Sequence, residues 1–163
     1  MLKLVIHGGA GSLEGKTAEV KNIHQSLCRI WEETFEILKE KNAKEAVIHG
    51  IRLLEDDPVF NAGTGSKLQA DGKIRMSAAL MDGVKNIFSG VINVQNIRSP
   101  IKAAALLSKE KNTVLSADQA TEFCRNHGFE EHDPLTHSRL KEYENKCNGL
   151  HGTVGIVALD NKG

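Results

Sequence analysis

The sequence predicts an α+β fold in a single domain of 163 residues. Over 18–41 and 43–56, apolar residues recur at the spacing of an amphipathic helix. From about residue 66 the pattern changes to that of strands, and Asp-Gly pairs at 71–72 and 82–83 are typical of hairpin turns. Long helices, hairpin-linked strands and further helices predict a layered arrangement around one core.

The first three elements each have a local signal. The apolar run LKLVI predicts a buried-type strand at 2–6. In the long helix that follows, we expect Trp31 to lie in the core and Cys28 to be a small buried side chain. The second helix ends at Asp57-Pro58, because the residue before a proline disfavours helical backbone.

The rest of the chain predicts five more segments. Strand-like arms around the two Asp-Gly pairs indicate an antiparallel meander over roughly 66–96. Proline at a first helical position marks one helix start, and a capping-box pattern of Ser116 with Gln119 marks another. A charged stretch with little apolar periodicity predicts an exposed linker with a short helical turn near 138–146. After the meander, we expect helices at 100–109 and 116–128, the linker at 129–150 and a strand within 151–160.

Composition excludes several classes of function. The 21 Lys and Arg residues balance the 21 Asp and Glu residues, so no basic excess favours nucleic acid or an anionic membrane. No apolar run is long enough to cross a bilayer and the N-terminus is unlike a signal peptide, so we expect a cytoplasmic protein. Three cysteines without a C-x-x-C pair do not predict a disulfide framework. Histidines at 127, 132 and 137 are five apart, which favours a solvated loop over a metal site.

The glycine-rich segment VIHGGAGSLEGKT, at 5–17, raises the question of phosphate binding. A P-loop needs a glycine, four residues and then Gly-Lys-Ser/Thr. Counting back from Gly15, the required glycine falls on Ala10, and the neighbouring glycines are out of register. The strand that ends in Asp160 has the form of a magnesium-binding partner, so a nucleotide-binding domain stays an alternative.

The step Gly152-Thr153 has the form of a self-cleaving bond. Gly152 has no side chain to block a strained peptide, and Thr153 supplies a hydroxyl at the start of a rigid strand. Attack on the preceding carbonyl would make Thr153 a new N-terminus, whose α-amine, with an ordinary pKa of about 8, would serve as base for its own hydroxyl. On pattern alone, a threonine that opens a strand is also a common β-former.

Four segments support this interpretation: VIHGGAGS (5–12), LLEDDPVFNAGTGS (53–66), SGVINVQNIRSPI (89–101) and HGTVGIVALD (151–160). In this order they resemble the plant-type L-asparaginase/isoaspartyl aminopeptidase family of N-terminal nucleophile hydrolases. The resemblance spans most of the chain and is weakest over 113–150. It implies a four-layer αββα sandwich, made as a precursor that cuts itself, and hydrolysis of β-aspartyl dipeptides and L-asparagine.

Carried onto this sequence, the resemblance makes Thr153 the nucleophile and Gly152–Thr153 the bond that is cut. Asn61 matches the asparagine that helps to orient the threonine, although an asparagine before Ala-Gly is also typical of a plain turn. The glycines Gly8 and Gly9, followed by Gly11, resemble the segment that lies against the cleavage region. This interpretation explains the glycine-rich segment by close backbone approach, without a phosphate.

The resemblance also implies a structural sodium ion, with no cofactor for the chemistry itself. Main-chain carbonyls suit a hard alkali cation, and one irregular loop presents several of them. Side-chain spacing alone would not reveal such a site. The matching carbonyls belong to Leu54, Glu55, Asp57, Phe60, Ala62 and Thr64.

The resemblance divides the domain into portions. Residues 1–128 correspond to the core of an α portion, 129–150 to a linker, and 151–163 to the cleavage site and first strand of a β portion. We expect the family's substrate-binding Arg and Asp beyond Gly163, which makes a C-terminal β portion the partner of this segment and a dimer of αβ units the assembly. The chain departs from the family at Ser77, where relatives commonly carry Asp, and at SADQATEF, which replaces a Gly-Ala step.

Two other functions compete with the hydrolase. A catalytically inactive fragment or pseudoenzyme of the family would have the same α portion and a structural or interaction role. The nucleotide-binding domain is the other, and ATP binding by a Lys16→Ala variant tests it. The intact mass of the complete protein distinguishes a processed enzyme from an uncut chain.

Overall fold

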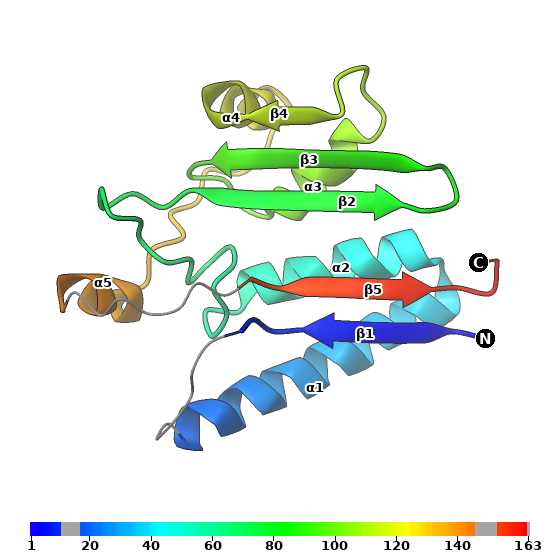
Figure 1. Cartoon of the computed structure of the whole chain (residues 1–163), viewed down its shortest axis with the longest axis horizontal. Helices are drawn as coiled ribbons and strands as arrows, with labels where there is room; N and C mark the ends of the chain where they lie inside the picture. The colour runs from blue at the N-terminus through cyan, green and yellow to red at the C-terminus, as the bar shows by residue number, and fades with distance from the viewer. Residues whose placement is uncertain (11–16, 146–152, 163) are drawn as a thin grey trace.

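A computed structural model describes residues 1–10, 17–145 and 153–162, and shows helices and strands intermixed along the chain (Figure 1). This confirms the predicted α+β class. Over these residues the elements are β1 (Lys3–His7), α1 (Thr17–Glu40), α2 (Ala43–Asp56), β2 (Met76–Asp82), β3 (Ile87–Val94), α3 (Pro100–Leu107), β4 (Val114–Ser116), α4 (Ala117–Asn126), α5 (His137–Glu144) and β5 (Gly155–Leu159).

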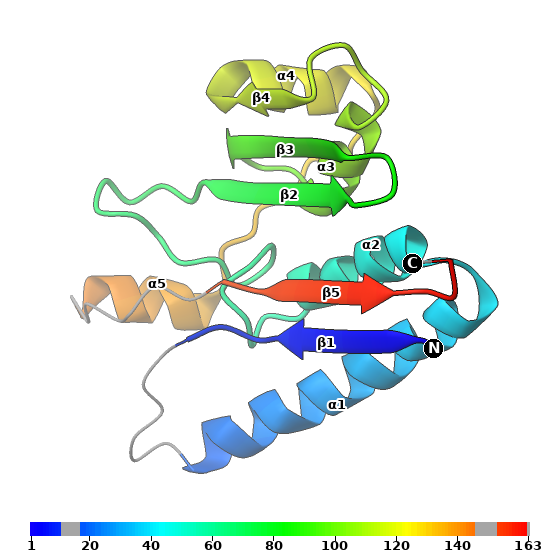
Figure 2. The same ribbon diagram turned by 45° about the vertical axis from the view of Figure 1, so that its right-hand side comes forward.

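The described strands form two small sheets. β1 and β5, from opposite ends of the chain, pair antiparallel, with Val5 opposite Val157. β2 and β3 also pair antiparallel, and the short strand β4 joins β3 in parallel. In both views the two sheets lie on the same face of the molecule, with β5 as the strand of its sheet nearer to β2 and a gap between the sheets (Figures 1 and 2).

Helices cover one face of these strands. α1 and α2 pack on the β1–β5 sheet, while α3 and α4 pack on the other sheet (Figure 2). Apolar side chains between the layers form the core, in two clusters. The fully buried side chains include Ile30, Leu54, Phe60, Val91, Val94, Ile101 and Leu107.

The opposite face of the strands exposes large apolar side chains. Val157 is 73% exposed and its partner Val5 is 66% exposed. On the other sheet, Met81 and Phe88 pair across β2 and β3, and both are more than half exposed. The described part of the chain therefore covers its strands on one side only.

The helix boundaries agree well with their sequence signals. Asn42 precedes α2 and caps it, because its side chain accepts a hydrogen bond of 3.0 Å from the backbone N–H of Glu45. α4 begins directly after Ser116, as predicted. The Ser116 side chain makes no capping hydrogen bond, however, so the capping box predicted with Gln119 does not form.

The predicted meander is shorter than expected. Asp71-Gly72 does lie in a tight turn, closed by a 2.9 Å hydrogen bond from Gln69 N–H to the Lys73 carbonyl. The residues directly before this turn do not form a strand. Within the predicted meander, strand pairing begins only at β2. The residues from 64 to 70 form hydrogen bonds with the chain around α5 instead of with another strand.

Two side chains of α1 are less buried than predicted. Trp31 is 37% exposed, its indole N–H donates to the Leu4 carbonyl over 3.3 Å, and its ring stacks on Phe35. Cys28 is exposed. Both predictions were wrong because the side of α1 that packs on the core does not include these two residues. That side carries Ile30, Thr34 and Leu38.

The stretch from residue 129 is mostly exposed or half-buried where the structure describes it, and the short helix predicted near 138–146 is present as α5 (His137–Glu144), but specific contacts fix this stretch to the rest of the fold. Glu131 forms an isolated β-bridge with Ile97. Pro134 is buried, and its carbonyl accepts a 2.9 Å hydrogen bond from Gly65 N–H. The segment then continues as α5. It lacks apolar periodicity because polar groups hold most of it in place.

Candidate active site

A cavity of about 760 Å³ opens where the two sheets meet the loop that follows α2. Thr153 and Asn61, far apart in the sequence, both line it. Ser77 of β2 also lines the cavity, and its hydroxyl accepts a 3.1 Å hydrogen bond from Asn93 N–H. The fold thus brings the predicted nucleophile and its predicted orienting residue to one cavity.

Thr153 is exposed and stands two residues before β5. Its position follows from that strand, which pairs with β1 along its whole length and contacts α2. The side chain of Ile156 points into the apolar layer and packs with the core cluster of α1 and α2. Gly152, and with it the bond predicted to be cut, lies outside the described residues.

Gly8 and Gly9 directly follow β1. Because β1 and β5 pair antiparallel, with His7 opposite Gly155, the two glycines lie alongside the residues just before β5. A Cβ on Gly8 would lie 3.0 Å from the Phe60 ring and 3.1 Å from Leu27, and Gly9 has a φ of 108°, which side chains rarely allow. Gly8 therefore fits a narrow space between the Phe60 and Leu27 side chains, and Gly9 takes a backbone conformation that favours glycine. Residues 11–16, on which the P-loop comparison depends, lie outside the described residues.

Asp160, which follows the last strand, has a structural role. Its Oδ2 accepts a 3.0 Å hydrogen bond from the backbone N–H of Ala43, at the start of α2. Carboxylates are favourable at a helix N-terminus because of its unpaired N–H groups and dipole. This contact joins β5 to α2 and accounts for the acidic end of the strand without magnesium.

Asn61 lies in the loop between α2 and β2. Its Oδ1 accepts a 2.9 Å hydrogen bond from the backbone N–H of Lys67. With this oxygen engaged on the loop itself, the amide nitrogen is the end of the side chain that donates hydrogen bonds. The contact fixes how Asn61 is oriented at the cavity wall.

The loop predicted to bind sodium folds back on the end of α2. Thr64 N–H donates to the Glu55 carbonyl over 2.7 Å. A continued helix would bond the Leu54 carbonyl to residue 58, but Pro58 has no N–H. Gly63 has a φ of 51°, and a Cβ there would overlap with the Glu55 carbonyl. The Leu54 carbonyl therefore has no helical partner at residue 58, and the chain turns back sharply on the end of α2.

The remaining predicted ligands lie on the same loop. The Asp57 carbonyl accepts a 3.2 Å hydrogen bond from Phe60 N–H, and a Cβ on Gly65 would lie 3.0 Å from the Phe60 carbonyl. Ala62 lines the cavity. Among residues 1–10, 17–145 and 153–162, no three His, Cys, Asp or Glu side chains gather around a possible metal site.

The side chain of Glu55 is a feature that sequence reasoning missed. It is 5% exposed and lines the cavity. Its Oε1 accepts a 3.0 Å hydrogen bond from Ile101 N–H, while Oε2 has no partner among the described residues. Burial raises the pKa of Glu55 to about 8, and Asp56 adds to this, whereas the Ile101 hydrogen bond, Lys102 and Arg52 act in the opposite direction. The sequence did contain one signal for this burial. Glu55 lies four residues after Ile51, and therefore on the same, apolar side of α2.

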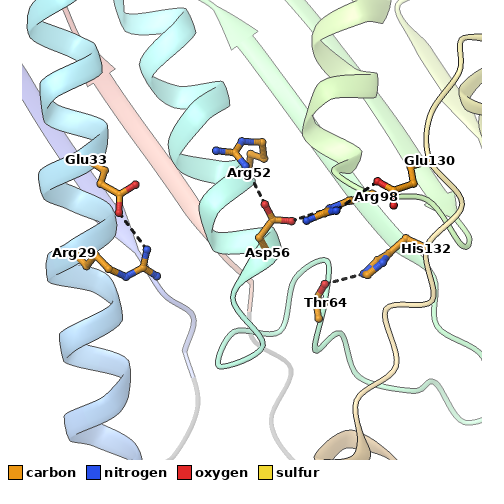
Figure 3. A network of polar contacts seen from close by, with 8 residues as sticks. All are labelled: Arg29, Glu33, Arg52, Asp56, Thr64, Arg98, Glu130 and His132. Atoms are coloured by element: carbon orange, nitrogen blue, oxygen red, sulfur yellow. Dashed lines mark hydrogen bonds and ion pairs between the residues drawn. The ribbon is translucent and has the colours of Figure 1, made fainter.

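A chain of ion pairs ties α2 to the segments before α3 and after α4 (Figure 3). Asp56 accepts from Arg52 over 3.0 Å and from Arg98 over 3.3 Å, and Arg98 also pairs with Glu130 over 3.4 Å. These side chains border a second cavity of about 390 Å³. The arginines already share carboxylate partners, so this network holds three segments together.

None of the helices in the described residues has both the length and the apolar character needed to span a membrane.

The chain is similar in sequence to known proteins of one family. Residues 1–149 match a family model described as asparaginase. The isoaspartyl peptidase/L-asparaginase of Nostoc sp. is 41% identical, over 99% of this chain and 58% of its own length. The isoaspartyl peptidase/L-asparaginase of Homo sapiens is 35% identical, over 98% of this chain and 56% of its own. The plant-type L-asparaginase of Thermococcus kodakarensis is 36% identical, over 88% and 47%.

The chain therefore spans about half the length of the curated relatives that it matches. The family match covers most of its residues and includes the loop that carries Asn61. On these grounds the chain belongs to the asparaginase family.

Proposed function

We propose that the complete protein is a self-processing amidohydrolase that acts on β-aspartyl dipeptides and L-asparagine, with Thr153 as its nucleophile. The observation that supports this most directly is that Thr153 and Asn61 line one cavity. The names of the relatives, isoaspartyl peptidase/L-asparaginase and plant-type L-asparaginase, support the substrate class.

The first step is cleavage of the chain. Oγ of Thr153 attacks the carbonyl carbon of Gly152, the peptide C–N bond breaks, and the nitrogen takes up the hydroxyl proton. Water then hydrolyses the resulting ester, which restores the hydroxyl and leaves a carboxylate on Gly152. The α-amine of Thr153 is free only after this step, so the uncut chain should be inactive.

In the cut enzyme, the α-amine of Thr153 accepts the proton of the hydroxyl while Oγ attacks the side-chain carbonyl of the substrate. The proton passes to the leaving nitrogen, which departs as ammonia from L-asparagine or as an amino acid from a β-aspartyl dipeptide. Water hydrolyses the acyl-enzyme ester and releases aspartate. Asn61, with its Oδ1 held by Lys67 N–H, orients the threonine through its amide nitrogen.

The same proposal includes the assembly. The exposed apolar face of the strands, with Val157 and Phe88 on it, is suited to packing against a second sheet, which would complete a four-layer αββα sandwich. That sheet would come from a C-terminal β portion, and two αβ units would form a dimer. The loop from Leu54 to Thr64 would hold a structural sodium ion.

Substitutions at Thr153 test the function. Thr153→Val keeps the β-branched shape and removes the hydroxyl, so the full-length gene product should fold but neither cleave nor hydrolyse substrate. Thr153→Ser keeps an oxygen at the β position and should still cleave, more slowly. Intact mass, N-terminal sequencing and asparaginase assays measure these outcomes. Normal hydrolysis by Thr153→Val would end the proposal, and an uncut, inactive wild-type protein would favour the pseudoenzyme.

A further inference from the structure

Helix α5 docks on the wall of the cavity through charged groups. Nζ of Lys67 lies 2.6 Å from Oε1 of Glu142 on α5. Arg139, also on α5, donates from Nε to the Gly65 carbonyl over 2.6 Å and from its guanidinium to the second oxygen of Glu142 over 2.8 Å. The side chains of Lys67, Arg139 and Glu142 are only 22%, 17% and 26% exposed. This is a partly buried network, unlike a loose surface ion pair.

The residues just before α5 hold the same loop. Nε2 of His132 forms a 2.8 Å hydrogen bond with the hydroxyl of Thr64 (Figure 3), and the Pro134 carbonyl accepts from Gly65 N–H. The chain from His132 to Glu142 therefore contacts the loop at residues 64, 65 and 67, all within a few residues of Asn61.

Lys67 connects this network to the candidate active site. Its side chain binds Glu142, while its backbone N–H donates to Oδ1 of Asn61 over 2.9 Å. Lys67 also lines the cavity. Any shift of this residue moves the donor that fixes the Asn61 amide.

We infer that Glu142 and Arg139 of α5 are positioning residues for the hydrolysis, which hold Lys67 and the Gly65 carbonyl so that Asn61 keeps its orientation toward Thr153. The inference rests on the proposed function. On this inference, the segment between the α-portion core and the cleavage site takes part in turnover and does more than connect the two.

The charge of Glu142 agrees with this role. Its burial would raise the pKa of the carboxyl, but the hydrogen bonds from Lys67 and Arg139 outweigh burial and lower that pKa below its ordinary value. Glu142 is therefore ionised at neutral pH and holds both cations.

A double-mutant cycle on the full-length gene product tests the inference. The variants are Glu142→Gln, Asn61→Ala and the two combined, with kcat and KM measured per mole of cut enzyme after the cut fraction is determined by intact mass. Glu36→Gln is the matched control, because Glu36 forms an equally short ion pair of 2.6 Å with Lys39 on the exposed side of α1. We expect Glu142→Gln to lower kcat roughly three- to thirtyfold with little change in KM, since small misplacements of a catalytic group are costly. Glu36→Gln should leave kcat unchanged.

In the Asn61→Ala background, Glu142→Gln should cause no further loss of kcat, because it acts through Asn61. If the two effects multiply, or if Glu142→Gln lowers the melting temperature but not kcat, the inference is wrong. Arg139→Lys, which keeps the charge but not the forked geometry, serves if Glu142→Gln does not fold, with the same expected result. An active Thr153→Val variant would disprove the proposed function itself, whereas an inactive one with a normal Glu142→Gln would disprove only this inference.

Discussion

Gly50 on α2 lies directly against Ile156 on β5, where a methyl group would overlap the Ile156 side chain and approach the Thr34 hydroxyl to 2.5 Å. Thr34 is itself fully buried and donates to the Ile30 carbonyl. A glycine inside a helix is otherwise unfavourable, so the close approach of the strand explains it. The contact sets how near β5, and therefore Thr153, lies to the helical layer.

Replacing Gly50 with alanine should destabilise the protein. Overpacking of this kind costs about 1–3 kcal/mol, which outweighs the gain of about 1 kcal/mol in helix propensity. Gly83→Ala is the matched control, because nothing lies within 4 Å of a Cβ at Gly83. Urea unfolding of both variants measures the difference, and equal stability would contradict the close contact.

Sodium should stabilise the protein through the carbonyl loop. We expect a higher melting temperature in sodium chloride than in tetramethylammonium chloride at equal ionic strength. Gly63→Ala should abolish this difference, because a methyl group there would displace the Glu55 carbonyl. Pro58→Ala should reduce it, because the new N–H would compete for the Leu54 carbonyl.

Asp57→Asn is the control for the sodium experiment. Its side chain can still accept the 3.1 Å hydrogen bond from Val59 N–H, and the carbonyl remains in place. The sodium dependence should therefore persist in this variant. A wild-type protein that melts at the same temperature in both salts would rule out the cation site.

Glu55 should make stability fall as the pH rises. Its pKa is raised from 4.5 to about 8 in the folded protein, so the folded state keeps a proton that the unfolded chain releases. The stabilisation is complete below about pH 4.5 and is lost between there and about pH 8, with a slope of at most about 1.4 kcal/mol per pH unit. Glu55→Gln imitates the protonated carboxyl and should remove this slope.

The Glu55 measurement needs a buffer without sodium, because a cation at the Glu55 carbonyl would stabilise the carboxylate. Urea unfolding at several pH values between 4.5 and 8 gives the slope for wild type and Glu55→Gln. Parallel curves for the two proteins would show that Glu55 ionises as freely as in the unfolded chain.

The cysteines should differ strongly in reactivity. Cys124 is fully buried on α4, and burial raises the pKa of its thiol to about 11, so little thiolate forms. Cys28 is exposed on α1. Iodoacetamide at pH 8 should label Cys28 well before Cys124, which should react only in denaturant. Peptide mapping by mass separates the sites, and equal rates in the native protein would contradict the packing of α4.

Much of the helical layer was predictable because its signals are local. Asn42 before α2 and Asp57-Pro58 after it mark the ends of that helix in the sequence itself. The placement of Asn61 and Thr153 at one cavity is different in kind. Spacing and periodicity contain no information about it, and the prediction came from resemblance to a family.

The docking of α5 was not predictable for a physical reason. Lys67 and Glu142 are 75 residues apart, and their contact is a salt bridge with no apolar pattern to mark it. A charged, aperiodic stretch has the same composition whether it is solvated or bound by specific polar partners. The burial of the Glu55 side chain was not predicted because glutamate carboxyl groups are ordinarily exposed.

The exposed face of the strands should be an interior surface of the complete protein. Val157 of β5 is 73% exposed in the described structure and points away from α2, whereas Val84, 77% exposed, lies in the turn between β2 and β3. If a second sheet covers the strands, Val157→Asp buries an unpaired charge and should cost at least about 3 kcal/mol. Val84→Asp introduces the same charge at a similarly exposed position in a turn, and should cost less than about 0.5 kcal/mol. Thermal melts and soluble yield of the full-length gene product compare the two, and equal melting temperatures would mean that no sheet packs on this face.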